Sequence, residues 1–308
     1  MDLLYTLESL RCPLLDSIMQ LITRLGEETF FLVIAIAIFW CIDKYEGYYL
    51  MGIGLLGTVV NQFLKILCRI PRPWVIDPEF TVVGSAKEAA TGYSFPSGHT
   101  QSAVSVFGGL SLWSRRWWLR LLLLLPVILV PFSRMYLGVH TPLDVGVSFG
   151  IAILFALAFY PLYRCIQKKP QIMLWLSVGM AVIAAAFVLF MELATFPADV
   201  DAENLAEARK NAYTLLGSLS AVVLVWIADK KWLHFDTKAV WWAQLIKLVL
   251  GLGLVIAVRA GLKQPLNALC GGHEIAHALR YFAIVAVAGI VWPATFKWFA
   301  KLGKKAQG

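Results

Sequence analysis

Three short segments of the chain carry the kinds of side chain that phosphoryl transfer requires. They supply cations that hold phosphate oxygens, a helix start that binds an anion, histidines that attack phosphorus or move a proton, and a carboxylate. Each segment falls at the end of an apolar run, so helix ends are expected to bring the three together. In chain order they contain Lys65 and Arg72; Ser97, Gly98 and His99; and Arg134, His140 and Asp144.

The segment Pro96-Ser97-Gly98-His99-Thr100 predicts a helix start that binds an anion. Ser97 is a preferred N-cap residue, and the backbone amides of Gly98 and His99 lack intrahelical acceptors at the positive end of the helix dipole. Gly98 also lets an anion approach the backbone closely. A serine-glycine pair alone is usually only a cap, so the prediction depends on the other two segments.

The segment from His140 to Asp144 predicts an oriented histidine. Thr141, Pro142 and Asp144 have the order of an N-cap, a first helical proline and an acid at the third helical position. His140 therefore precedes the helix, and Asp144 in its first turn can orient the imidazole and stabilise its charged form. The other ring nitrogen is then available to attack phosphorus.

Lys65, Arg72 and Arg134 place permanent positive charge at the ends of apolar runs. A phosphoryl group offsets the cost of these charges, and they are expected to hold its equatorial oxygens. In isolation, each cation at a span end is read more simply as a side chain that snorkels to the membrane interface. Arg69, one turn after Lys65, has no assigned role in the site and is expected to snorkel.

The composition places these segments in a membrane protein. Of 308 residues, 59% are hydrophobic and 15% are charged, and the mean hydropathy is +0.72, far more apolar than a soluble domain. A helix needs about 20 apolar residues to cross about 30 Å of hydrocarbon, so the fold class is all-α, a polytopic membrane helical bundle without strands. Nine transmembrane helices are expected, near 27–44, 46–68, 98–114, 117–134, 142–164, 171–193, 212–228, 239–262 and 277–299.

The chain divides into three parts. Residues 1–26 mix apolar and charged residues, which predicts an amphipathic interfacial segment, while residues 27–168 hold the three segments as a catalytic core. Residues 169–308 add C-terminal membrane helices without these motifs. The N-terminus has no basic region before its first apolar run, so no cleaved signal peptide is expected. The five cysteines lack CxxC spacing, so neither a metal cluster nor a disulfide framework is predicted.

Lysines and arginines collect in alternate connections between the expected spans. By the positive-inside rule these connections face the cytoplasm, so the N-terminus lies outside and the C-terminus inside. The three segments then open on the non-cytoplasmic face. The net charge of +8 is explained by this topology, and no nucleic-acid partner is predicted. Examples of these basic residues are Lys44, Arg116, Arg164, Lys231 and Lys297.

Together, the three segments resemble the signature motifs of the type-2 phosphatidic acid phosphatase superfamily, which includes lipid phosphate phosphatases, glucose-6-phosphatases and vanadium haloperoxidases. The resemblance covers about residues 40–165 and implies catalysis without a metal ion or other cofactor. It implies that His140 is the nucleophile that forms a phosphohistidine, that Asp144 is its partner, and that His99 protonates the leaving alkoxide. The residues implied to bind the phosphate are Lys65, Arg72, Ser97, Gly98 and Arg134.

A rival function from another class comes from His273-Glu274-Ile275-Ala276-His277, which fits the His-Glu-x-x-His pattern of zinc proteases. On a helix this pattern places His273 and His277 one turn apart, with Glu274 available as a base. Zinc needs a third protein ligand, and no partner motif is evident, so a polar helix entrance or a lid is favoured. Further charges in apolar runs are expected to pair internally or to snorkel: Glu192, Lys247, Arg259 and Arg280.

The predicted function is metal-independent hydrolysis of a lipid phosphate monoester or a polyprenyl diphosphate. Every site residue addresses the phosphoryl group, so the sequence leaves the lipid open, and a lipid phosphotransferase or a sugar-phosphate phosphatase remain alternatives. The expected setting is a bacterial cytoplasmic membrane, with the bilayer and a lipid substrate as partners. The C-terminal helices are expected to wall the substrate groove or to form a homo-oligomer interface.

Overall fold

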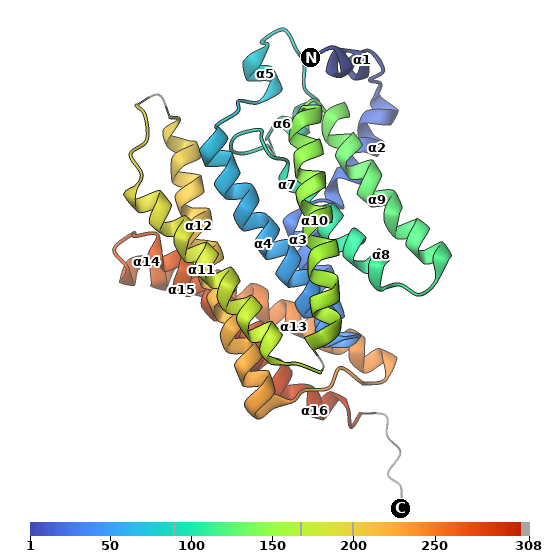
Figure 1. Cartoon of the computed structure of the whole chain (residues 1–308), viewed down its shortest axis with the longest axis vertical. Helices are drawn as coiled ribbons and strands as arrows, with labels where there is room; N and C mark the ends of the chain where they lie inside the picture. The colour runs from blue at the N-terminus through green and yellow to red at the C-terminus, as the bar shows by residue number, and fades with distance from the viewer. Residues whose placement is uncertain (89, 167, 199, 303–308) are drawn as a thin grey trace, which may run out of the picture. The chain divides into compact units, whose positions relative to one another are not determined.

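The computed structural model describes residues 1–302 except 89, 167 and 199, and the secondary structure of this part is entirely helical (Figure 1). The all-α prediction is therefore confirmed. Seven helices are long and apolar enough to cross a membrane. These spans are Lys44–Ile76, Trp117–Tyr136, Pro142–Ile166, Gln171–Leu193, Ala202–Leu233, Trp241–Leu269 and Ile275–Phe299.

The other two apolar segments expected to span are also helical, but they are shorter. The expected span near 27–44 is α3, Glu28–Cys41, whose 14 residues extend about 21 Å at 1.5 Å per residue. The expected span near 98–114 consists of α7 (Gly98–Ala103), the π-helical turn η1 (Val104–Gly108) and α8 (Gly109–Trp113). Neither reaches the length of the seven full spans.

The described residues form two compact units, each assembled from several stretches of the chain. Unit 1 comprises Met1–Ile34, Tyr49–Pro161 and Thr195–Ala208, and unit 2 comprises Ala35–Tyr48, Leu162–Ala194 and the chain from Arg209 on. All the residues of the three motif segments belong to unit 1. The residues of the His-Glu-x-x-His pattern belong to unit 2.

In unit 1, the end of α9 and the start of α10 lie at the same end of the unit (Figure 1). The connection that carries α5 and α6 lies at the same end, above the start of α7. The helices of unit 1 are α1 (Asp2–Ser9), α2 (Pro13–Arg24), α5 (Pro73–Ile76), α6 (Gly84–Glu88), α7, η1, α8, α9 (Trp117–Tyr136), and the larger parts of α4 (Lys44–Cys68) and α10 (Pro142–Ile166).

The N-terminal helices of unit 1 brace the stretch that precedes His140. Helix α2 packs along α9, and the hydroxyl of Tyr136 at the end of α9 donates to Asp16 Oδ1 at 2.8 Å. Arg11 Nε donates to the Tyr136 carbonyl at 3.0 Å. Gly138, at φ +81°, lies so close to Arg11 that a Cβ there would approach the guanidinium to 2.8 Å. The turn into His140 thus depends on glycine, because L side chains rarely adopt this φ.

Unit 2 contains the charges that sequence analysis found in apolar runs. Glu192 pairs with Arg209 at 3.3 Å, and both side chains of this ion pair are more than a third exposed. Lys247 is fully buried and forms no ion pair within the described part of the chain. Its Nζ donates to the Thr237 carbonyl at 3.0 Å and lies 4.4 Å from the centroid of the Phe296 ring. The helices of unit 2 are α11 (Gln171–Leu193), η2 (Asp229–Leu233), α13 (Trp241–Gly261), α14 (Lys263–Leu269), α15 (Ile275–Ala286), η3 (Val287–Val291), η4 (Pro293–Thr295), α16 (Phe296–Phe299) and most of α12 (Ala202–Ala228).

Candidate active site

His140 is buried, and its two ring nitrogens face different partners. Nδ1 lies 3.5 Å from Asp144 Oδ2 and 3.4 Å from the Ser94 hydroxyl. Nε2 lies 3.1 Å from Nη1 of Arg72. A guanidinium can only donate, so Nε2 is the acceptor and the neutral ring carries its proton on Nδ1, toward Asp144. This tautomer leaves the lone pair on Nε2, the nitrogen that a phosphorus atom would meet.

Asp144 is held in place by a reciprocal cap at the start of α10. Its Oδ2 accepts from the backbone amide of Thr141 at 2.7 Å, and its own amide donates to Thr141 Oγ1 at 3.3 Å. The predicted order of N-cap, proline and acid is thus confirmed as a capping box. Ser94 adds a hydrogen bond to the same carboxylate oxygen at 2.5 Å. These hydrogen bonds hold the Asp144 carboxylate in the position from which it orients His140.

Two of the predicted phosphate-binding cations share one loop. Arg72 donates through Nε to the carbonyl of Gly92 at 3.0 Å and through Nη2 to that of Thr91 at 2.5 Å. Lys65, in the last turn of α4, donates to the carbonyl of Tyr93 at 2.5 Å. Three successive carbonyls thus hold the cations beside His140. A phosphate must draw these donors away from the carbonyls when it binds.

The loop 91–93 is in turn attached to the start of α12. The Thr91 hydroxyl donates to Glu207 Oε1 at 3.0 Å. Glu207, Thr91 and Lys65 also line a cavity of about 30 Å³, room for little more than a water molecule. The carboxylate therefore places a negative charge next to the cations that would bind a phosphate.

Ser97 caps α7 as predicted. Its side chain accepts from the Thr100 amide at 3.4 Å, and its own amide donates to the Asp144 carbonyl at 3.1 Å, so the two helix starts are joined. Gly98 and His99 occupy the first turn. Gly26 packs so closely that a Cβ there would lie 2.8 Å from the His99 carbonyl oxygen. Position 26 therefore needs a glycine, because a side chain there would displace the backbone of His99.

Arg134 lies in the last turn of α9 and is only 2% exposed. Its Nη1 donates to the Thr23 hydroxyl of α2 at 2.9 Å, while its Nε is buried without a hydrogen-bond partner. A buried cation with an unused donor is suited to bind an anion.

The electrostatics of the site keep His140 neutral. Burial lowers the pKa of His140 well below its usual value, and the positive charges of Arg72, Arg134 and Lys65 lower it further. His99 also lies near enough for its charge to lower this pKa. The structure thus brings predicted residues from all three segments close to His140, whose ring is kept neutral.

Sequence reasoning missed Ser94, Asn61 and Glu207. Asn61 is 3% exposed, both polar atoms of its side chain lack hydrogen-bond partners, and its Oδ1 would lie 4.0 Å from a Cβ on Gly98. It lies one turn before Lys65 on α4, a spacing that could have drawn attention to it. Ser94 and Glu207 carry no local signal, because their partners lie far away in the chain.

The structure bears on two hypotheses drawn from the sequence, the role of Arg69 and a zinc site in the His-Glu-x-x-His segment. Arg69 has φ +50°, and its Nη1 donates to the Ile66 carbonyl at 3.4 Å, so it closes the last turn of α4. The hypothesis of a zinc site at His273 and His277 lacks a third protein ligand. No group of three His, Cys, Asp or Glu in the described part of the chain could hold a metal. His277 instead accepts from Arg280 Nη2 through Nδ1 at 3.0 Å.

Comparison with known proteins places this chain in a family. The sequence model of the PAP2 superfamily matches residues 46–168, and that of the PAP2 superfamily phosphatase transmembrane extension matches residues 213–305. Undecaprenyl-diphosphatase BcrC of Bacillus subtilis is 31% identical over 148 residues, which are 47% of this chain and 74% of that protein. Sphingosine-1-phosphate phosphatase 1 of Rattus norvegicus is 33% identical over 155 residues, 48% of this chain.

The chain belongs to the PAP2 superfamily and is an integral membrane protein. The resemblance seen in the three motif segments is thereby confirmed. The C-terminal residues, which carry none of these motifs, match the transmembrane extension of the same superfamily. The matched stretch spans 35% of the length of the rat phosphatase, and phosphatidylglycerophosphatase B of Bacillus subtilis is 27% identical over 75% of its length. No solved structure matches the chain.

Proposed function

We propose that this protein is a metal-independent phosphatase that hydrolyses a lipid phosphate monoester or a polyprenyl diphosphate through a phosphohistidine on His140. The main observation in support of this proposal is the set of partners that the two ring nitrogens of His140 face. Asp144 and Ser94 face Nδ1, and Arg72 donates to Nε2, so the nucleophilic lone pair points at a guanidinium that also binds phosphate oxygens. The low pKa of this buried histidine supports the same role.

The first chemical step transfers the phosphoryl group to the histidine. Nε2 of His140 forms a bond to phosphorus while the phosphorus–oxygen ester bond breaks, and its electron pair leaves with the alkoxide. His99 protonates this oxygen. Asp144 stabilises the positive charge that develops on the ring, and the phosphate oxygens are held by Lys65, Arg72, Arg134, Ser97 and Gly98.

The second step releases phosphate. A water molecule loses a proton to His99 and attacks phosphorus, and the electron pair of the nitrogen–phosphorus bond returns to Nε2 of His140. An alcohol in place of water would make the protein a phosphotransferase. Phosphate release measured with and without candidate acceptor alcohols separates the two reactions.

The lipid substrate is supported by the relatives and by the membrane fold. The relatives are named for sphingosine 1-phosphate, undecaprenyl diphosphate and phosphatidylglycerophosphate, molecules that carry a phosphate or diphosphate. The positive-inside pattern supports a site on the non-cytoplasmic face. The relatives from Bacillus subtilis support a bacterial cytoplasmic membrane. A soluble sugar phosphate is the alternative substrate, and a panel of purified lipid and sugar phosphates compares them directly.

Trapping the intermediate tests the mechanism. Purified protein is mixed with a phosphorus-32-labelled substrate and quenched in alkali, because a phosphoramidate bond survives alkali and breaks in acid. We expect label on the wild-type protein, none on His140→Ala, and inhibition of turnover by vanadate but not by chelators. Labelling of His140→Ala equal to wild type would refute the covalent role of this residue.

A further inference from the structure

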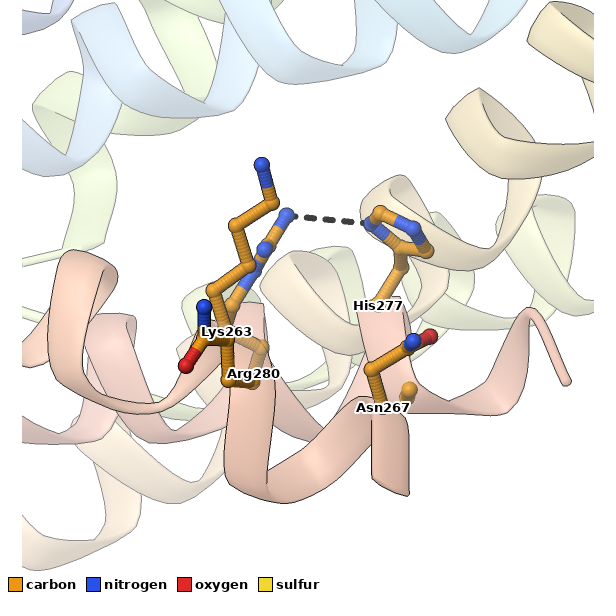
Figure 2. Close-up of a pocket in the computed structure, with 6 residues that line it drawn as sticks. Lys263, Asn267, His277 and Arg280 are labelled. Atoms are coloured by element: carbon orange, nitrogen blue, oxygen red, sulfur yellow. Dashed lines mark hydrogen bonds between the residues drawn. The ribbon is translucent and has the colours of Figure 1, made fainter. Parts of the chain in front are cut away.

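A second cluster of cations lies in unit 2, around the turn that joins α14 to α15. Figure 2 shows Lys263, Asn267, His277 and Arg280 directed toward one cavity. Its volume is about 170 Å³, and its walls come from α14 and α15, which pack against each other. Gln264 completes the polar lining. The cavity therefore presents two cations, two amides and an imidazole, and no carboxylate forms part of its lining.

Arg280 is the central group of this cavity. It is only 8% exposed, although it belongs to an apolar helix. One donor, Nη2, is used by His277 Nδ1 at 3.0 Å, and the guanidinium carbon lies 5.2 Å from the Tyr281 ring centroid. Its Nε is buried and has no hydrogen-bond partner among the residues that the structure describes. A buried guanidinium with unused donors requires an anion or another acceptor.

His277 and Glu274 also orient the guanidinium of Arg280. His277 Nδ1 accepts from Arg280, so the neutral ring carries its proton on Nε2, which lies 3.5 Å from Glu274 Oε2. Glu274 and His277 thus act through the ring to position Arg280. None of the ion pairs in the described part of the chain engages Arg280 or Lys263, so their charges are not neutralised by the protein.

The position of the cavity along the helices indicates the ligand. The spans Trp241–Leu269 and Ile275–Phe299 are joined by a short turn, and Arg280 lies five residues into the second, about 8 Å along the helix axis. Lys263 lies six residues before the end of the first. Both cations therefore lie within two helical turns of the joined ends of the two spans, the part of a membrane helix that is expected nearest to lipid head groups.

We propose that Arg280, Lys263 and His277 form a second phosphate-binding site in unit 2, separate from the site around His140. Its ligand is a phosphate group, carried by an anionic lipid head group or as free phosphate. Arg280 holds two oxygens through its unused donors, Lys263 neutralises charge at the exposed rim, and Asn267 and Gln264 donate from their amides. The site binds and performs no chemistry. It also gives the His-Glu-x-x-His segment a role other than metal binding.

Lipid binding to the purified full-length protein tests this proposal. The probe is phosphatidylglycerol, titrated against wild type, Arg280→Gln and Lys263→Gln, with phosphatidylcholine as the lipid control. We expect Kd for phosphatidylglycerol to rise roughly tenfold or more in Arg280→Gln and by a smaller factor in Lys263→Gln. Lys263 is exposed, so its variant keeps the test valid if Arg280→Gln fails to fold. Phosphatidylcholine should bind all three alike.

Two control variants separate this site from other cations. Arg259→Gln removes an exposed arginine of α13 outside the cavity and should leave Kd unchanged. Arg134→Gln perturbs the site around His140. Binding that depends on Arg134 and not on Arg280 or Lys263 would overturn the proposal, as would an equal Kd in all variants.

A parallel titration with inorganic phosphate distinguishes the source of the ligand. Phosphate binding that depends on Arg280 while phosphatidylglycerol binding does not would identify the free ion as the ligand. Lipid binding that depends on Arg280 without such phosphate binding would identify the head group. If neither ligand depends on Arg280 or Lys263, the site does not exist. Phosphate release from a substrate should stay normal in Lys263→Gln, so this outcome is independent of the catalytic mechanism.

Discussion

Both units contain an arginine that donates to a histidine whose other ring nitrogen faces a carboxylate. In unit 1, Arg72 contacts Nε2 of His140, and Asp144 lies 3.5 Å from Nδ1. In unit 2 the nitrogens are exchanged, because Arg280 contacts Nδ1 of His277 and the carboxylate lies 3.5 Å from Nε2. Each unit thus has an arginine, a histidine and a carboxylate at similar distances, but the residues that surround the two groups differ.

The surroundings decide what each arrangement can do. The His140 and Asp144 side chains are 2% and 0% exposed, whereas those of His277 and Glu274 are 22% and 30% exposed. Asp144 is additionally held by the Thr141 amide and Ser94, and two helix starts meet beside it. A histidine, an arginine and a carboxylate therefore suffice to orient a group, whereas the nucleophilic chemistry proposed for unit 1 also needs the full burial and the rigid support found around His140.

The largest expected contrast comes from removing each histidine. His140→Ala should lower kcat by roughly 10³-fold or more, because the nucleophile is lost, whereas His277→Ala should change kcat less than about twofold. Phosphate release from a lipid phosphate, with thermal unfolding of both variants as a folding control, measures this. Near-normal turnover by His140→Ala would remove the distinction between the two units.

Ser94 tests whether the additional support of Asp144 matters. Ser94→Ala deletes the hydroxyl that donates to the carboxylate, so kcat should fall about tenfold with little change in KM. Ser17→Ala, which removes a hydroxyl bonded only to the Pro13 carbonyl, serves as a matched control. The role assigned to Ser94 is wrong if both variants retain full kcat.

The pH dependence tests the charges around His140. Nε2 must be unprotonated to attack, and burial together with Arg72 lowers the pKa of His140 below its usual 6.5, so wild-type activity should persist below that pH. Arg72→Met removes a positive neighbour and should raise this pKa, which moves the acid limb of kcat/KM to higher pH. Comparing the two profiles measures the shift, and an unmoved or opposite limb contradicts this electrostatic account.

The smallest expected effect concerns Glu207. Glu207→Gln retains an acceptor for the Thr91 hydroxyl but removes the negative charge beside Lys65, so KM for a phosphate substrate should fall about two- to fivefold. Steady-state kinetics at low and high salt check this, because screening should reduce the difference. Glu203→Gln, on the first turn of the same helix, is a control. A higher KM in Glu207→Gln would show that the carboxylate chiefly stabilises the loop 91–93.

The sequence by itself determined the medium, the helical fold class and most of the candidate site residues. Apolar run length reports the number of residues available to cross a bilayer, and Ser97 and the Thr141–Asp144 box are local patterns, since a cap bonds within three residues. The sequence did not predict that α3 and the run from α7 to α8 are shorter than full membrane spans.

Only the tertiary structure decided how these groups meet. The proton position on His140 depends on Arg72, 68 residues away, and the support of Asp144 depends on Ser94, 50 residues away. Arg280 became a candidate ligand site because folding buried it without a carboxylate, which its sequence neighbours do not reveal. Hydrogen bonds and desolvation between distant residues have no local sequence signature, because they arise from packing of elements that the chain order does not make adjacent.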